Sequence, residues 1–429
     1  MTNSEIRMTN QPQRSAEEAA RIRRGAYRWN TAAGILHGGQ SIFMLFVITR
    51  VCDVVTAGVF TIAFAVANLF MNMGWYGMRK FQVSDRKDKY SFLEYRGSRI
   101  ATTGAMVLCL LAYIAYTSIT LGYSADKTYI IVMMCLFKTV DSFEDVYSGG
   151  YQHDDRLDVG ARMVTIRQIA LIPFFSVTLI LSGDLGIALT ATTVFTALFF
   201  LGQVRFVRKR YNLPHLTPVF SWSKVCMLLK ECFPLFAGAF LLFYVGNAPR
   251  YAIDALTNDS IQAYFGYVSM PVFVVTMLAS FVYNPMITEL TDEWLDGNRR
   301  TFLMRLAKIV GIIAALTAIA DVLAWLLGVP VLNILYNTDV SPYVPELLIL
   351  VTGGGFLALA TLETVGITII RFQRVFVPLY LALTVVAYFA SNWAVANWGI
   401  TGAAWAYFGI MLLGAAMFAI AFLIGTRMK

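Results

Sequence analysis

Four charged side chains interrupt one apolar stretch of the sequence. Lys138, Asp141, Glu144 and Asp145 all lie within residues 129–147. Residues three or four apart share a helix face, so Lys138, Asp141 and Asp145 are expected to form one polar strip. A charge at the centre of a membrane helix costs at least about 2.5 to 3.5 kcal/mol and usually faces protein or water. The strip is predicted either to line a water-filled cavity or to neutralise itself and stabilise helix packing.

Two other acids fall inside apolar stretches. A carboxylate taken out of water can change its charge near neutral pH, which suits it to bind a coupling ion. Asp321 and Glu363 are therefore candidates, with Asp141 and Asp145, for binding a proton or sodium ion. Helix capping or ordinary pairing is the alternative for each.

Two arginines lie at the ends of corresponding apolar stretches. Arg50 is followed by Asp53, and Arg250 is followed by Asp254. Either arginine can extend toward lipid headgroups, or the pair can contact a substrate. Because they are almost the only positive charges on their side of the predicted membrane, a substrate role is a working hypothesis.

The composition indicates which elements must position these side chains. The 429 residues are 58% hydrophobic and 14% charged, with a mean hydropathy of +0.63, whereas soluble domains carry about 25% charged residues. An ordinary soluble enzyme is excluded, and an all-α polytopic membrane protein is predicted. Because a span needs about 20 apolar residues, twelve are predicted, at residues 31–51, 55–76, 100–121, 129–147, 163–181, 185–204, 232–250, 262–287, 306–327, 346–370, 376–397 and 399–424.

The distribution of positive charge tests this count, because Lys and Arg collect on the cytoplasmic side of membrane proteins. Thirty of the 34 Lys and Arg residues fall in the two ends, in alternate connections or in the turn after them, with Arg99 and Arg167 counted among these. The exceptions are Arg50, Lys127, Lys138 and Arg250. This asymmetry predicts an even number of spans and cytoplasmic termini. It also accounts for the net charge of +8 without a nucleic-acid partner.

Motifs for common enzyme chemistry are absent from the sequence. There is no GxxxxGK[ST] loop, no HExxH and no GxSxG. His37, His153 and His215 are too scattered for a metal site, and the five cysteines show no CxxC spacing, so no cofactor is predicted. The predicted outer connections are too short for the extramembrane domain of a glycan polymerase or glycosyltransferase. Transport is favoured over catalysis.

The longest predicted connection divides the spans into six and six. It is basic and contains Pro214 and Pro218, as expected where a duplicated transporter joins its halves. The predicted organisation is a cytoplasmic tail (1–29), an N-terminal bundle (30–206), a cytoplasmic linker (207–231), a C-terminal bundle (232–425) and a cytoplasmic end (426–429). The similar endings at Arg50 and Arg250 are consistent with duplication, with chance similarity as the alternative.

Short motifs along the whole chain point to a family. They are NTAAGIL from Asn30, YGMRKFQVSD from Tyr76, EDVY from Glu144 with Gln152 and RLD from Arg156 after it, NAPRYAID from Asn247, and GVPVL from Gly328 with Tyr336 after it. In this order around twelve spans, they resemble the bacterial polysaccharide-export flippases. That family belongs to the multidrug/oligosaccharidyl-lipid/polysaccharide exporter superfamily.

The resemblance implies two six-helix bundles, related by a pseudo-two-fold axis, that open alternately to the two sides of a bacterial plasma membrane. It implies that a lipid-linked oligosaccharide, typically on undecaprenyl pyrophosphate, moves to the outer leaflet for surface polysaccharide synthesis. Membrane lipids, a polysaccharide polymerase and glycosyltransferases are the implied partners. Multidrug exporters of the superfamily commonly carry a carboxylate in the first helix, and this one has none. Ion-coupled export of small drugs is therefore the second hypothesis, and a membrane enzyme of glycan assembly the third.

A pyrophosphate headgroup needs compensating positive charge to cross hydrocarbon. The candidate cavity cations are Arg50, Lys138 and Arg250, with Arg79, Arg371 and Arg374 near the inner mouth. With the cytoplasm negative, an outward-moving anion gains about 2.3 kcal/mol per charge per 100 mV. The membrane potential can therefore bias the direction of transport without ATP, and coupling to an ion is the alternative.

Overall fold

The computed structural model describes residues 15–85, 88–214 and 219–428. Parts of the predicted tail (1–29), linker (207–231) and end (426–429) lie outside these residues. The described chain is helical over about 90% of its length and has no strands. Its helices are α2 (Ala16–Gly38), α3 (Gln40–Val51), α4 (Val54–Trp75), α5 (Met78–Ser84), α6 (Phe92–Thr120), α7 (Ala125–His153), α8 (Leu157–Ser182), α9 (Leu185–Tyr211), α10 (Trp222–Leu256), α11 (Asp259–Tyr283), α12 (Ile287–Leu295), α13 (Arg299–Tyr336), α14 (Val344–Ile369) and α15 (Phe376–Arg427), with short 3-10 helices at Asn284–Met286, Ser341–Tyr343 and Gln373–Val375.

The local sequence explains many helix ends. Ser91 and Glu94 form a reciprocal capping box at the start of α6, which satisfies two backbone N–H groups. Asp184 and Asn258 cap α9 and α11 through a side-chain oxygen that accepts one backbone N–H. Gly183 ends α8 in the left-handed conformation that glycine adopts without strain.

The helices account for the predicted twelve spans. Nine helices within the described residues are long and apolar enough to cross a membrane, and the bent pair α2 and α3 makes a tenth. α7 has 29 residues, enough to span, but carries the charged strip. Gly399 adopts a non-helical φ of 55° and divides α15 into two spans. The prediction of an all-α polytopic fold with about twelve spans is confirmed.

Contacts divide the chain into two compact units. Unit 1 comprises the described residues up to Cys52 and Ala63–Phe240, and unit 2 comprises Asp53–Ile62 and the described residues from Leu241 onward. The observed division therefore falls within α4 and within α10. The predicted domain boundaries stay predictions.

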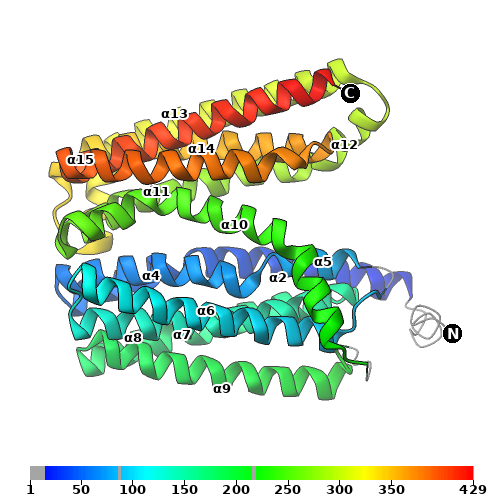
Figure 1. The fold of residues 1–429 in the computed structure, drawn as a ribbon, viewed down its shortest axis with the longest axis horizontal. Helices are drawn as coiled ribbons and strands as arrows, with labels where there is room; N and C mark the ends of the chain where they lie inside the picture. The colour runs from blue at the N-terminus through cyan, green and yellow to red at the C-terminus, as the bar shows by residue number, and fades with distance from the viewer. Residues whose placement is uncertain (1–14, 86–87, 215–218, 429) are drawn as a thin grey trace. The chain divides into compact units, whose positions relative to one another are not determined.

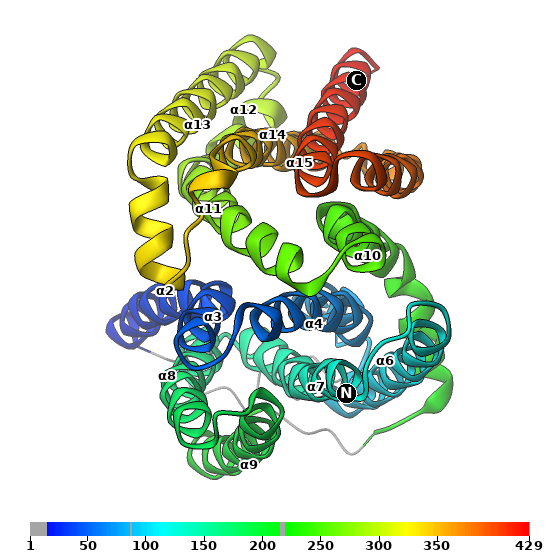
Figure 2. The ribbon, with the colours of Figure 1, turned by 90° about the vertical axis from the view of Figure 1, so that its left-hand side faces the viewer.

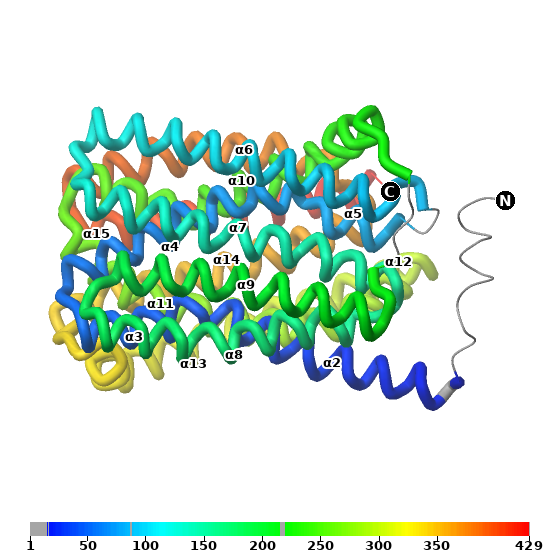
Figure 3. The backbone as a smooth tube through the Cα atoms, turned by 90° about the horizontal axis from the view of Figure 1, so that it is seen from below, coloured from blue at the N-terminus to red at the C-terminus, as the bar shows by residue number. Residues whose placement is uncertain are grey.

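Each unit is built around one helix. In unit 1, α7 contacts α5, α6, α8 and α9, and it lies among α6, α8 and α9 when viewed along the helices (Figure 2). Helices α6 to α9 run alongside one another (Figures 1 and 3). In unit 2, α14 contacts α11, α13 and α15. The two central helices are the fourth span of each half, and they carry Asp141 and Glu363, respectively.

Candidate functional site

A break between α4 and α5 shapes the site in unit 1. Tyr76 and Gly77 both have positive φ, at 52° and 62°, so the helix cannot continue through them. Tyr76 stacks on Phe236 at 4.6 Å between ring centroids. The break leaves the carbonyl of Gly74 free to accept a hydrogen bond from Arg99. It also places Trp75, just before it, and Arg79, just after it, against α7.

The charged strip of α7 forms a buried network with α8. Lys138 Nζ lies 3.0 Å from Asp141 Oδ2, and Arg167 Nη2 lies 2.5 Å from Asp141 Oδ1 and 2.6 Å from Glu144 Oε2. Arg167 also donates to Thr196 Oγ1 at 2.9 Å. The side chains of Lys138, Asp141 and Arg167 are at most 1% exposed. Two cations thus neutralise two carboxylates inside the bundle, as a buried pair requires.

A relay of hydrogen bonds leads from this network to a histidine. Lys138 Nζ donates to Gln40 Oε1 at 2.7 Å, and Gln40 Nε2 donates to Gln168 Oε1 at 3.3 Å. Gln168 Nε2 then lies 3.2 Å from His37 Nδ1. Lysine can only donate, so each amide in turn has one orientation. The direction of the relay makes His37 Nδ1 an acceptor, and Nε2 carries the ring proton.

A second cluster surrounds Asp145, one turn further along α7. Its Oδ2 lies 2.7 Å from Arg99 Nη2, and its Oδ1 lies 3.6 Å from Arg79 Nη1. Arg99 is fully buried, whereas the side chain of Arg79 is 36% exposed and donates to Gln152 at 3.1 Å. Together, the two clusters hold four cations and three carboxylates. One positive charge is in excess, and it falls in the cluster that includes Arg79.

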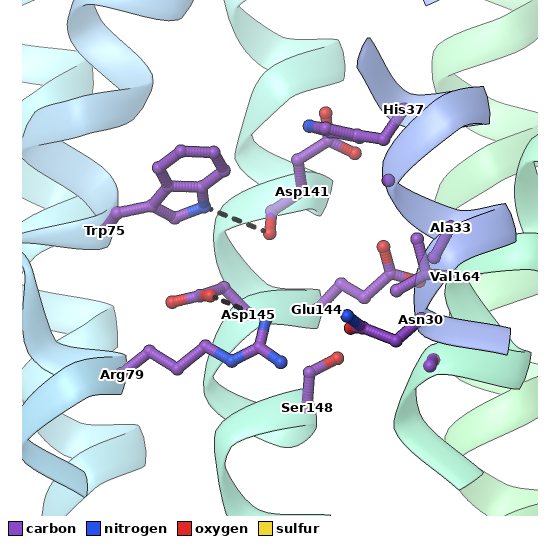
Figure 4. Close-up of a pocket in the computed structure, with 12 residues that line it drawn as sticks. Asn30, Ala33, His37, Trp75, Arg79, Asp141, Glu144, Asp145, Ser148 and Val164 are labelled. Atoms are coloured by element: carbon purple, nitrogen blue, oxygen red, sulfur yellow. Dashed lines mark hydrogen bonds and ion pairs between the residues drawn. The ribbon is translucent and has the colours of Figure 1, made fainter. Parts of the chain in front are cut away.

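A pocket of about 350 Å³ lies beside both clusters. Arg79 and Asn30 approach this space from opposite sides, with Ser148 beneath them (Figure 4). Trp75 Nε1 donates to the carbonyl oxygen of Asp141 at 3.5 Å, which orients the indole. The pocket is lined by Asn30, Ala33, Gly34, His37, Trp75, Arg79, Asp141, Glu144, Asp145, Ser148, Ala161 and Val164.

Of the sequence-predicted cations, Arg79 lines this pocket, and Lys138 lies behind its wall. Lys138 is 1% exposed and reaches the pocket only through Asp141 and the relay. Arg50 is exposed at the end of α3, where it stacks on Phe46 at 3.6 Å and donates to the carbonyl oxygen of that residue.

Arg250 occupies a different environment in unit 2. It donates to Ser269 Oγ at 2.5 Å, and no carboxylate in the described chain pairs with it. Ser269 lies on α11, and its hydroxyl donates to the carbonyl oxygen of Gly266 at 3.0 Å. The Arg250 guanidinium also lies 5.9 Å from the centre of the Phe265 ring on α11, so it packs against this helix.

Tyrosines surround Arg250. Tyr251, Tyr407 and Tyr336 lie near its guanidinium, and Tyr336 stacks on Tyr267 with 4.6 Å between ring centroids. The hydroxyls of Tyr267 and Tyr336 are buried and make no hydrogen bond within the described chain. Buried polar groups of this kind call for water or a bound ion.

The other predicted residues of unit 2 do not gather at one place. Asp321 accepts a hydrogen bond from Thr352 at 3.1 Å, and its Oδ1 is buried without a partner in the described chain. Glu363 Oε2 is likewise buried and unpartnered there. Arg371 and Arg374 are exposed in the connection between α14 and α15.

Two members of the clusters, Arg99 and Arg167, were not among the predicted site residues. They were predicted to belong to cytoplasmic connections, but they lie well inside α6 and α8 and are fully buried. That assignment was wrong because the positive-inside pattern does not distinguish a loop cation from the partner of a buried acid. The position of Arg167 in the middle of an apolar run was the available signal. Among the described residues, no three potential metal ligands come together.

Comparisons with known proteins agree with this architecture. No family model and no curated protein matches the sequence. Among solved structures, a lipid II flippase, MurJ, in an inward closed conformation has a TM-score of 0.69 at 13% identity, covering 93% of this chain and 87% of that chain. An inward-facing multidrug resistance MATE transporter of the MOP superfamily has a TM-score of 0.56 at 12% identity, covering 93% of both. A mutant of the Vibrio cholerae MATE transporter VcmN scores 0.56 at 12% identity, covering 96% of this chain and 98% of that chain. The chain therefore has the fold shared by a lipid II flippase and by multidrug transporters of the MOP superfamily.

Proposed function

We propose that this protein is an alternating-access flippase. In this proposal it moves a lipid-linked oligosaccharide, carried on undecaprenyl pyrophosphate, from the cytoplasmic to the outer leaflet of a bacterial plasma membrane. The lipid tail can stay in the bilayer, so only the anionic headgroup and its glycan need a polar path. The product would supply surface polysaccharide synthesis, with a polymerase and glycosyltransferases as partners.

The observation that carries the proposal is the surroundings of Arg250. Its guanidinium lacks a carboxylate partner in the described chain, and the buried hydroxyls of Tyr267 and Tyr336 lack hydrogen-bond partners there. A half-buried cation near hydroxyls without partners favours an anion, because charge-assisted hydrogen bonds to an anion would satisfy these groups. The pyrophosphate of a lipid-linked sugar supplies that chemistry.

The other predicted cations take different parts in the proposal. Arg371 and Arg374 are exposed between α14 and α15 and would attract the headgroup at the inner mouth. Arg50, exposed at the end of α3, would meet the headgroup on the outer side. Lys138 is buried behind the pocket of unit 1 and would act by positioning its neighbours. Arg79 would contact the substrate directly from the pocket wall.

The membrane potential can drive this movement. Two charges that cross a field of 100 mV gain about 4 to 5 kcal/mol in the outward direction. That gain is large enough to set the direction of net transport. ATP hydrolysis on this chain is not part of the proposal.

Ion-coupled export of small drugs is the second candidate, and the carboxylates of unit 2 favour it. Asp321 and Glu363 each have a buried oxygen without a partner in the described chain. In either function they are the groups best placed to bind a proton or sodium ion, since Asp141 and Asp145 already have cation partners.

Depletion of the protein from its own cells tests the proposal. We expect a lipid-linked sugar to accumulate on the inner leaflet, identified by mass spectrometry of lipids and by its resistance to sugar-modifying reagents added outside. Re-expression of the wild type should clear it, and expression of Arg250→Ala should not. Arg305→Ala is the matched control, because Arg305 pairs with Glu293 at 2.7 Å. Depletion that raises drug sensitivity and leaves lipid-linked sugars unchanged would favour the second candidate.

A further inference from the structure

The pocket of unit 1 has a chemical character of its own, distinct from the surroundings of Arg250. Glu144 and Asp145 face it with every carboxylate oxygen already near one guanidinium. These ion pairs fix the two acids in place. Because each carboxylate oxygen can accept more than one hydrogen bond, the acids can still accept hydrogen bonds from a ligand. Arg79 and Asn30 add donors from opposite sides of the space (Figure 4).

The relay from Lys138 adds a further donor. Since His37 Nδ1 accepts from Gln168, His37 offers its Nε2 proton. Gln40 and Gln168 are both fully buried, so their orientations are held by one another and by Lys138. The buried lysine thus determines, from a distance, which hydrogen-bonding group His37 presents.

We propose that this pocket binds an uncharged sugar ring of the glycan, an inference that rests on the proposed flippase function. A sugar carries hydroxyls that both donate and accept, together with a face of C–H groups. The pocket pairs fixed acceptors and donors with the indole of Trp75, which is oriented by the carbonyl of Asp141. Its volume of about 350 Å³ falls within the range of small-molecule sites, which run from about 300 to 1,000 Å³.

The charges of the two clusters argue against charged ligands. A cation would find no unpaired carboxylate, because Asp141, Glu144 and Asp145 all have Lys or Arg partners. A pyrophosphate would meet these three acids at the pocket wall with Arg79 as the lining cation. An uncharged sugar ring needs no unpaired carboxylate and is not repelled by the three acids.

Gly34 provides a way to fill the pocket without distorting the helix. A Cβ built at Gly34 meets no other atom within 4 Å, although Gly34 lines the pocket. A larger side chain there is expected to enter the open space. Gly104 on α6 is exposed and also has no atom within 4 Å of a built Cβ. The two glycines therefore make a matched pair for substitution.

Sugar binding can be measured directly on the purified protein in lipid nanodiscs. Saturation-transfer difference NMR with free glucose, galactose and N-acetylglucosamine as probes should show transfer to at least one sugar in the wild type. Gly34→Phe should abolish the transfer, and Gly104→Phe should retain it. His37→Phe should weaken it, and His37→Gln should retain it, because an amide can replace the Nε2 donor. Asn30→Ala, which adds no bulk, should also weaken it.

Other outcomes separate this inference from the flippase proposal. Binding of inorganic pyrophosphate, followed by phosphorus NMR, should be lost in Arg250→Ala and kept in Gly34→Phe. No transfer to any of the three sugars, or equal transfer in both glycine variants, would overturn the sugar site. Binding of tetraphenylphosphonium that Gly34→Phe abolishes would also overturn it. These results leave the accumulation of lipid-linked sugar on depletion as an independent test of the flippase.

Discussion

The central helices of the two units, α7 and α14, differ in whether their buried acidic side chains have charged partners. On α7, Asp141, Glu144 and Asp145 all have Lys or Arg partners within 3 Å. On α14, Glu363 has a buried oxygen with no partner in the described chain. Arg250, also in unit 2, has no carboxylate partner there either. The charges of α7 are thus paired within unit 1, whereas Glu363 and Arg250 in unit 2 have no charged partner in the described chain.

Removing one member of a buried ion pair leaves the other without compensation and is strongly destabilising. Removing a buried charge that has no partner relieves a desolvation cost. Substitutions in unit 1 are therefore expected to affect folding first, and those in unit 2 to affect transport first.

The largest effect is expected for Arg167→Ala. The variant leaves Asp141 and Glu144 short of their shared cation, which costs about 3 to 5 kcal/mol for a buried pair. We expect little folded protein in detergent, measured by fluorescence-detected size exclusion and thermal unfolding. Arg162→Ala, at an exposed position on the same helix, is the control. A variant that melts like the wild type would show that the network of α7 is not structural.

Arg250→Ala should affect transport strongly and stability only slightly, the reverse of Arg167→Ala. The hydrogen bond from Arg250 to Ser269 has a charged donor and contributes about 1.5 to 3 kcal/mol, and loss of a half-buried charge without a carboxylate partner offsets part of this. We expect Tm to change by no more than a few degrees and surface polysaccharide to disappear, scored by polymer staining and by thermal unfolding. Arg305→Ala should keep the wild-type Tm and the surface polysaccharide. A large fall in Tm for Arg250→Ala would place Arg250 with the structural charges of unit 1.

Glu363→Gln tests the unpartnered carboxyl group of α14. A neutral amide of the same shape cannot ionise at this buried position, so the Tm at neutral pH should be equal to or higher than that of the wild type. If Glu363 binds the coupling ion, transport should lose its dependence on pH. Asp145→Asn is the contrasting variant, because Asp145 has two arginine partners and its neutralisation should lower Tm. Equal destabilisation by both variants would contradict the distinction between the two units.

The smallest change in Tm is expected for a substitution outside the membrane, at Lys89. Its ammonium lies 2.5 Å from Glu231, and this hydrogen bond raises the pKa of Lys89 above its ordinary 10.5. A raised pKa means that the stabilisation is present at neutral pH and is lost as the pH rises through that pKa. Lys89→Ala should lower Tm slightly at neutral pH, and the difference should vanish at strongly alkaline pH. The exposed Lys80 provides the control variant, Lys80→Ala, and a difference that grows with pH would refute the assignment.

Much of the fold follows from the sequence. The apolar runs and the alternation of positive charge predict the spans, because both depend on single residues meeting lipid or water. The spacing of Lys138 and Asp141 also predicts a contact, since they lie three positions apart and therefore on one helix face.

The partners of these charges depend on how different helices pack. Arg99 and Arg167 come from α6 and α8, and nothing in their spacing relates them to α7. The position of Arg79 depends on two consecutive left-handed residues, Tyr76 and Gly77, and the first of these is not a glycine. The relay from Lys138 to His37 joins residues of four helices, α7, α3, α8 and α2, so no local pattern could have predicted it.

Translocation by the purified protein is the most direct test of the central claim. Proteoliposomes would contain the lipid-linked sugar isolated from depleted cells, with an inside-negative potential and the protein inserted in its cellular orientation. Wild type and Arg305→Ala should expose the sugar to an external modifying enzyme faster with the potential than without it, and Arg250→Ala should not exceed protein-free vesicles. Exposure by Arg250→Ala at the wild-type rate, or none by the wild type, would contradict the account.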